Sequence, residues 1–92
     1  MRYTKNVNLY ELLENTTLSG FEWTGESVNQ ILSGIEYIKK HGLPNRYPLL
    51  YKTDYGKYVS IKGTDLLIAA IMSKCENMDV IIIESESKWK KY

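Results

Sequence analysis

The sequence comprises 92 residues, of which 43% are hydrophobic and 25% are charged, and its formal net charge is +1. This length is enough for one small domain with its own core and leaves too few residues for a second. The near-zero charge disfavours a protein that holds nucleic acid by general electrostatic attraction, because such proteins carry a basic excess. No apolar run approaches the length that crosses a bilayer, no secretory leader is expected, and a lone cysteine, Cys75, excludes an internal disulfide framework. These features predict a cytoplasmic protein without a membrane partner.

Two short segments open the chain. Asn8–Glu14 predicts a short helix, because Asn8 can cap it and three leucines follow at helical spacing. After the polar residues that end this helix, Thr17–Trp23 predicts an extended or turning segment. Its two aromatic residues, Phe21 and Trp23, are expected to pack on the core.

The clearest element is a helix that Thr24 or Gly25 caps and that runs to about His41. Gly42 is suited to the C-terminal cap of this helix, while Gly34 inside it predicts the close approach of another element. A one-sided apolar stripe at helical spacing is expected to face the core. The stripe consists of Val28, Ile31, Leu32, Ile35 and Ile38.

Tyr47–Thr53 and Lys57–Lys62 predict two strands, joined as a β-hairpin by a short loop that contains glycine. Pro48 indicates either a sheet edge or the point where the first strand enters the sheet. Thr64 is the expected N-cap of a largely buried helix, Asp65–Lys74.

The last predicted element is Asp79–Glu84, a continuous apolar strand that is expected to be covered on both faces. The order helix, irregular strand, helix, hairpin, helix, strand predicts an α+β fold in which two to three helices cover a small mixed sheet. Residues 1–84 are expected to form this single domain, and residues 85–92 a polar, mobile C-terminal tail.

Several stretches between Ser27 and Glu84 match the pattern of a known family. The pattern combines a glycine-containing helix, a proline before a strand, an acidic-glycine turn, a glycine that opens a helix ending in two alanines, and an apolar closing strand. The matching stretches are Leu32–Ile35, Gly42–Pro44, Asp54–Tyr58, Ile61–Ala70 and Val80–Ile83. With Phe21–Trp23 before them, they resemble the N-terminal domain of ParB and other proteins of the ParB/sulfiredoxin fold, including ParB-like nuclease domains. The resemblance implies the same α+β architecture.

The chain departs from this family at the corner where the relatives bind phosphate or nucleotide. The relatives carry arginines there, whereas this sequence has Lys62, Gly63, Thr64 and Asp65 followed by two leucines. Asp65 places a carboxylate in the first helical turn, where it satisfies the helix dipole and repels phosphate. The cysteine that sulfiredoxin-type chemistry needs at this corner is also missing. The resemblance therefore implies a degenerate corner, no catalytic residues and no enzymatic activity.

Other candidate chemistry has a simpler structural interpretation. His41 follows two lysines at a helix end, where a positive charge complements the dipole. Ser33 and Ser60 have no recognisable base nearby in sequence, and Cys75 lies far from a helix N-terminus, where reactive cysteines are often found. No second histidine or cysteine stands at the spacing of metal ligands. We therefore expect neither a metal nor a cofactor.

The leading hypothesis is a non-catalytic protein-interaction or regulatory module, of the type that phages and other mobile elements carry, with a protein as its partner. Its candidate interaction residues are aromatic and lie in two places, Phe21 with Trp23 and Trp89 with Tyr92. The sequence leaves the identity of the partner and the oligomeric state open.

The alternative is a nucleotide- or DNA-phosphate-binding module, a remnant of a ParB-like nuclease. In that case Lys62, Gly63, Thr64 and Asp65 keep a residual anion site at a helix start, helped by Arg46 and by the basic C-terminal residues. The simpler interpretation of the same four residues is a strand-to-helix turn.

Overall fold

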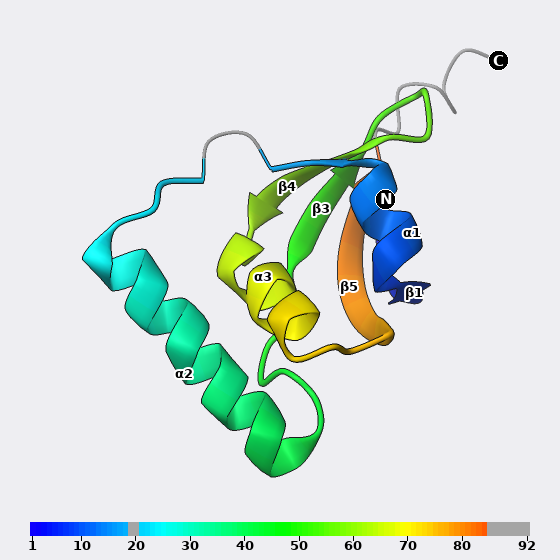
Figure 1. Cartoon of the computed structure of the whole chain (residues 1–92). Helices are drawn as coiled ribbons and strands as arrows, with labels where there is room; N and C mark the ends of the chain where they lie inside the picture. Colours follow the sequence, from blue (N-terminus) through cyan, green and yellow to red (C-terminus); the bar gives the residue numbers. More distant parts are fainter. Residues whose placement is uncertain (19–20, 85–92) are drawn as a thin grey trace, which may run out of the picture.

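The computed structural model describes residues 1–18 and 21–84. Figure 1 shows α3 lying over the sheet with the long helix α2 alongside it. The elements of the described residues, in chain order, are β1 (Arg2–Asn8), α1 (Leu9–Glu14), β2 (Thr16–Thr17), α2 (Gly25–His41), β3 (Leu49–Lys52), β4 (Tyr58–Lys62), α3 (Thr64–Met72) and β5 (Asn77–Glu84). The predicted α+β class, with helices over a small mixed sheet, is confirmed.

The described strands form one sheet in the order β1-β5-β3-β4-β2. β5 pairs antiparallel with β1 and parallel with β3, which in turn pairs antiparallel with β4. The sequence prediction missed β1. The reason is that β1 is an edge strand in which only Tyr3 and Val7 pack against the core, so its apolar signal is weak.

The interior strand β5 fully buries only one of its faces. Met78, Val80 and Ile82 are buried in the main core cluster, whereas Ile81 and Ile83 on the opposite face are half-buried. The expectation of complete cover on both faces is therefore wrong. A parallel sheet covered by helices on both sides shows continuous apolar strands, but here the apolar run of β5 lies in a mixed sheet with one well-packed face.

The predicted hairpin is present as β3 and β4. Thr53 and Lys57 close its loop through a hydrogen bond from the Thr53 amide to the Lys57 carbonyl, 2.8 Å. Pro48 is buried just before β3, and its carbonyl accepts a hydrogen bond of 2.9 Å from the Ile81 amide. Since β3 lies between β5 and β4, Pro48 marks entry into the sheet, and the edge interpretation is wrong.

The predicted caps of the first two helices are present. The Asn8 side chain accepts hydrogen bonds from the Tyr10 and Glu11 amides at the start of α1. At the start of α2, Thr24 and Ser27 form a reciprocal capping box. Gly42 ends α2 in the left-handed conformation, with φ of 79°. These local signals account for the accurate bounds of α2.

The apolar stripe of α2 is only partly buried. Ile31 and Ile38 lie in the core, but Val28 and Leu32 are exposed, so the expectation that the whole stripe faces the core is wrong. The helices α2 and α3 meet closely, because a Cβ at Gly34 would lie 3.0 Å from the Ala69 Cβ. The close approach predicted from Gly34 is confirmed.

The third helix begins one residue earlier than predicted and ends two residues earlier. Gly63 is its N-cap and Thr64 its first residue, so the prediction of Thr64 as the cap is wrong. The Thr64 hydroxyl is hydrogen-bonded instead to the Ser60 hydroxyl, with 2.6 Å between the two oxygens. The buried character of α3 is confirmed, since Leu66, Leu67, Ala69 and Ala70 are buried.

A polar cluster joins the ends of three strands. The buried Glu84 carboxylate of β5 accepts a hydrogen bond of 3.2 Å from the Tyr3 hydroxyl of β1 and lies 3.4 Å from the Lys52 ammonium of β3. Burial, followed by the nearby Glu84 charge, raises the pKa of Tyr3 above its ordinary value of 10.0. The hydrogen bond with Glu84 is the main cause that raises the pKa of Lys52.

These shifts predict a loss of stability at alkaline pH. The folded state holds the Tyr3 proton more tightly than the unfolded state does, so this stabilisation is complete below the ordinary pKa of tyrosine and is lost as pH rises above it. Urea unfolding at pH values of about 9 and about 11 measures the effect. We expect wild type to lose more stability over that interval than Tyr3→Phe, since the other seven of the eight tyrosines are common to both. An equal loss in the two proteins would contradict the expectation.

Candidate functional site

The predicted corner lies where β4 turns into α3, and it forms a groove of about 540 Å³. The turn forms one side of the groove, and the segment just before α2 forms the other. The lining residues are Phe21, Glu22, Ser60, Ile61, Lys62, Gly63, Thr64 and Asp65. The structure therefore brings the four corner residues together with Phe21, one of the two aromatic residues singled out near the start of α2.

Gly63 gives the corner its sharp turn. Its φ is 81°, a conformation that favours glycine, and a Cβ there would lie 3.0 Å from the Pro48 Cα. Because the N-cap is glycine, no cap side chain occupies the first backbone N–H groups of α3. The Thr64 hydroxyl, which the sequence analysis counted toward a residual anion site, is already hydrogen-bonded to Ser60.

The charges at the corner balance one another. Arg46, from the loop between α2 and β3, places its Nη2 3.7 Å from the Asp65 Oδ2, and the Asp65 side chain is only 14% exposed. Lys62 and Glu22 are exposed nearby. The two cations thus stand beside two carboxylates, and an incoming phosphate meets no net positive field.

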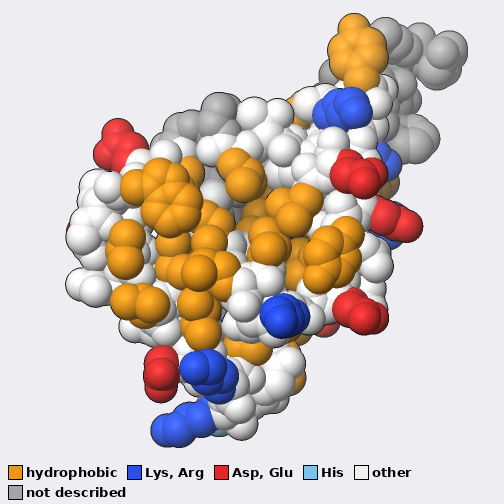
Figure 2. Space-filling view, in the orientation of Figure 1, with side chains coloured by type: hydrophobic (Ala, Val, Ile, Leu, Met, Phe, Trp, Pro, Cys, Tyr) orange, Lys and Arg blue, Asp and Glu red, His pale blue; other side chains and the backbone are white. Residues whose placement is uncertain are grey.

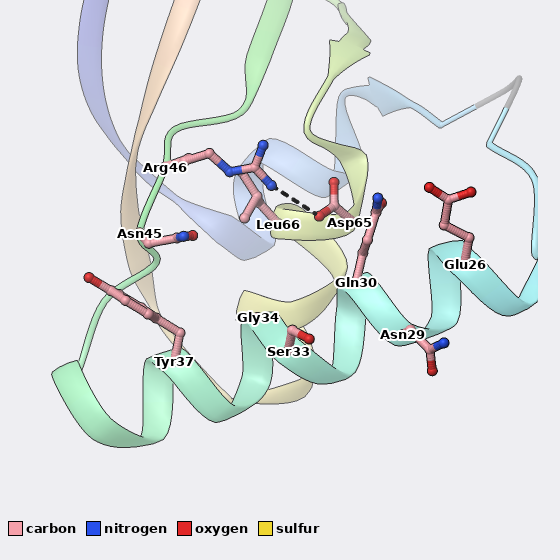
Figure 3. A pocket seen from close by; sticks show the side chains of 10 residues that line it. All are labelled: Glu26, Asn29, Gln30, Ser33, Gly34, Tyr37, Asn45, Arg46, Asp65 and Leu66. Carbon is pink, nitrogen blue, oxygen red and sulfur yellow. Dashed lines mark ion pairs between the residues drawn. The ribbon is translucent and has the colours of Figure 1, made fainter.

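A second groove, of about 620 Å³, adjoins the corner at Asp65. Figure 3 shows Gln30 and Tyr37 rising from α2 toward Asp65 and toward the loop that carries Asn45. The lining of this second groove is rich in amide and hydroxyl groups. It consists of Glu26, Asn29, Gln30, Ser33, Gly34, Tyr37, Asn45, Arg46, Asp65 and Leu66. Sequence reasoning missed this groove, because its residues lie along the polar side of α2 and only the fold brings the loop over them.

A hydrophobic surface lies on the outer side of the two packed helices. Figure 2 shows a broad hydrophobic area over α2 and α3, in the orientation of Figure 1. Leu32 of α2 is 53% exposed and Met72 of α3 is 61% exposed, with Val28 exposed and Ile68 half-buried. We refer to Val28, Leu32, Ile68 and Met72 as the α2–α3 face. Contiguous exposed apolar surface of this kind marks interaction sites in soluble proteins.

The predicted aromatic residues differ in their surroundings. Phe21 is half-buried and packs against the core cluster, as expected. Trp23 is 68% exposed, so the expectation that it packs on the core is wrong. The two rings contact each other edge to face, with centroids 5.0 Å apart. Trp89 and Tyr92 lie outside the described residues.

His41 and Cys75, for which the sequence favoured a structural role, do not belong to either groove. The His41 ring lies against the Tyr37 ring on α2, with centroids 4.2 Å apart, and Cys75 is half-buried. Among residues 1–18 and 21–84, no three histidine, cysteine or acidic side chains are grouped as metal ligands. None of the helices in that part of the chain is long and apolar enough to cross a membrane.

Comparisons with known proteins find a similarity in structure alone. No family model matches the chain, and no curated protein matches it in sequence. The chain is similar to the crystal structure of the C-terminally truncated chromosome-partitioning protein ParB from Caulobacter crescentus, complexed with CTP-γ-S. The TM-score is 0.63 at 15% sequence identity, over 90% of this chain and 45% of the ParB chain.

The fold is ParB-like. At 15% identity the similarity shows that the architecture is shared, and it assigns no role to any residue. The chain spans less than half of the ParB chain that it matches. The sequence resemblance to ParB is thereby supported at the level of the fold. The β4–α3 corner lies at the start of α3, whereas Met72 of the α2–α3 face is the last residue of that helix, so the two surfaces can be tested separately.

Proposed function

We propose that this ParB-like domain is a non-catalytic, cytoplasmic protein-interaction module that binds its partner through the α2–α3 face. The observation that carries the proposal is the exposure of Leu32 and Met72 on two adjacent, packed helices. Large apolar side chains that stand together on a rigid surface release water when a partner covers them. Both helices are held by core contacts, so little ordering is needed on binding.

The state of the corner supports the same proposal. The Asp65 carboxylate is engaged by Arg46, and the Thr64 hydroxyl is engaged by Ser60. A site that transfers or hydrolyses phosphate needs preorganised positive groups aimed at the developing charge. Here the nearest arginine is neutralised by the carboxylate, which favours binding over catalysis as the function of the domain.

Leu32→Glu is expected to abolish partner binding while leaving the fold intact, because it places a charge in the centre of the α2–α3 face. The measurement is retention of proteins from the native host on immobilised wild type and variants. Tyr55→Glu is the matched control, since Tyr55 is 89% exposed in the loop between β3 and β4, which lies well away from α2 in Figure 1. Proteins retained by wild type and Tyr55→Glu but lost with Leu32→Glu support the proposal, and identical retention by all three contradicts it.

A second candidate function is binding of a nucleotide or of DNA phosphate at the corner. The observation that favours it is the 540 Å³ groove at the start of α3, where the N-cap has no side chain and Lys62 is near. The similar ParB structure is a complex with CTP-γ-S, which supports testing nucleotides as ligands of this groove.

Titration of the ¹⁵N-labelled protein with CTP or ATP tests the second candidate by NMR. Binding at the corner shifts the amides from Gly63 to Leu66. Asp65→Asn is then expected to strengthen binding, because it frees Arg46 and removes a repelling charge, whereas Lys62→Ala weakens it. Unchanged spectra in wild type and in Asp65→Asn would eliminate this function.

A further inference from the structure

The groove of about 620 Å³ along α2 adjoins a shallow pocket at the C-terminal end of that helix. The pocket has a volume of about 290 Å³ and shares three lining residues with the groove, Tyr37, Asn45 and Arg46. The lining of the pocket also includes Leu43, Pro44 and Tyr47. Figure 3 shows α2 on one side of the groove, and the start of α3 with the loop that carries Asn45 and Arg46 on the other. We refer to the groove and the pocket together as the α2 groove.

The pocket at the end of the α2 groove suits an apolar side chain. Leu43 is 56% exposed and Tyr47 is 44% exposed, although both line the same small pocket. Tyr37 lines the pocket and the groove alike, and its ring lies against the His41 ring, with centroids 4.2 Å apart. A ligand side chain that covers these residues releases water from apolar surface, and the packed Tyr37 ring loses little freedom on binding.

The middle of the α2 groove carries side-chain amides that suit a peptide backbone. Figure 3 shows Gln30 rising from α2 toward Asp65, and Asn45 on the opposite loop near Tyr37. Neither amide is hydrogen-bonded to another of the described residues. A side-chain amide donates and accepts hydrogen bonds as a peptide group does, so the two amides can pair with the N–H and C=O groups of an extended chain.

The N-terminal end of the α2 groove is acidic. Glu26 is exposed in the first turn of α2, and within the described part of the chain no cation is paired with it. The other carboxylate of the groove, Asp65, lies 3.7 Å from Arg46. At the adjoining corner, Lys62 and Glu22 offset each other. Two carboxylates against one arginine repel a phosphate backbone and attract a basic group to Glu26, which favours a peptide over a nucleic acid.

We propose that the α2 groove binds an extended peptide segment of a partner protein, with an apolar side chain in the pocket at Tyr37 and an arginine or lysine at Glu26. At a rise of about 1.5 Å per residue, these two residues are about 16 Å apart along α2. An extended chain covers that distance in about five residues. Lys39 and Lys40 lie beyond Tyr37, about 20 Å from Glu26 along the helix, so screening keeps them from neutralising its carboxylate.

This site is separate from the α2–α3 face. Gln30 and Leu32 are two residues apart in α2, which corresponds to about 200° around the helix axis. The groove therefore lies on one side of α2, and the exposed Leu32 side chain lies on another. The inference adds a second contact to the proposed protein-binding function and does not depend on the first.

Selection from a phage-displayed library of random peptides of about ten residues tests the site, because that length spans both ends of the groove. Wild type, Glu26→Arg, Tyr37→Ala and Leu32→Glu are each immobilised, and circular dichroism establishes that each is folded. The peptide most enriched on wild type is then synthesised with a fluorophore. Fluorescence anisotropy measures its Kd for each of the four proteins.

We expect wild type to select peptides in which a large apolar residue stands about five positions from an arginine or lysine. Glu26→Arg should select an acidic residue in place of the basic one, and a new preference of this kind cannot come from a loss of folding. Tyr37→Ala is expected to raise the Kd of the wild-type peptide at least about tenfold. Leu32→Glu should leave that Kd within about twofold, since it lies outside the groove.

A wild-type selection without a common pattern, or a pattern that Glu26→Arg leaves unchanged, overturns this inference. A labelled oligothymidine that binds the groove in a Tyr37-dependent manner also overturns it, because the occupant would then be a nucleic acid. Peptide binding that is lost in Leu32→Glu and kept in Tyr37→Ala overturns it as well, but supports the proposed function. Likewise, if no peptide is selected while host proteins are retained in a Leu32-dependent manner, the inference fails and the proposed function stands.

Discussion

Replacing Gly63 with alanine is expected to lower the free energy of unfolding by about 2–4 kcal/mol. Two costs combine at this position. The backbone adopts φ of 81°, which an alanine Cβ disfavours, and the added Cβ would lie 3.0 Å from the Pro48 Cα and 3.2 Å from a Leu66 methyl carbon. Pro48 is itself buried at the entry to β3 and hydrogen-bonded to β5, so its backbone cannot retreat without disturbing the sheet.

Gly42→Ala is the matched control for this prediction. Gly42 has nearly the same φ, 79°, but nothing lies within 4 Å of a Cβ built there. Gly42→Ala should therefore lower the free energy of unfolding by only about 1–2 kcal/mol, the cost of holding alanine in the left-handed conformation. Urea unfolding measures the loss of stability in each variant. The additional loss in Gly63→Ala over Gly42→Ala is the cost of the close contact with Pro48. Equal losses of stability would show that the backbone near Pro48 relaxes and that the turn is less confined than described.

Substitution by alanine is expected to change the stability of the protein by very different amounts at two adjacent residues of α2. Ile31 is 3% exposed and packs in the core, so Ile31→Ala should lower the free energy of unfolding by about 2–5 kcal/mol. Leu32 projects from the α2–α3 face, so Leu32→Ala should change it by no more than about 0.5 kcal/mol. Both substitutions place alanine in the helix, and alanine is a good helix former. A difference in stability between the two variants therefore reflects burial of the side chain and not helix propensity.

Thermal and urea unfolding of the two variants provide the comparison, performed at low protein concentration so that association does not add to stability. Destabilisation by Leu32→Ala of the same size as that by Ile31→Ala would mean that the α2–α3 face is closed within one chain. That result would remove the basis for a binding surface there.

The elements that the sequence predicted well are those specified by neighbouring residues. Thr24, Ser27 and Gly42 set the limits of α2 through contacts within a few positions, and the hairpin loop follows from its glycine. β1 was missed because its place depends on pairing with β5, whose paired residues are 69 to 81 positions away, and within β1 only Tyr3 and Val7 contribute apolar contacts. Such long-range pairing leaves little trace in a local pattern.

The candidate site divides in the same way. The corner residues are consecutive in the chain, so the turn that gathers them was visible in the sequence. The pairing of Arg46 with Asp65 depends on how the loop after α2 folds back, which no local signal specifies. The exposure of Leu32 likewise depends on where α3 packs: α3 contacts α2 at Gly34, and two residues correspond to about 200° around a helix, so Leu32 points away from that contact.

The pairing of β1 with β5 has a practical consequence for the study of this domain. The Met1 amino group donates a hydrogen bond of 3.0 Å to the Glu84 carbonyl, and the Glu84 amide donates one of 2.9 Å to the Met1 carbonyl. Residues 1 and 84 therefore meet at one corner of the sheet, and Figure 1 shows that corner well away from α2. A tether attached before Met1 or after Glu84 holds the domain by the same point, so surface-immobilised protein can present α2 to the solution whichever end carries the linker.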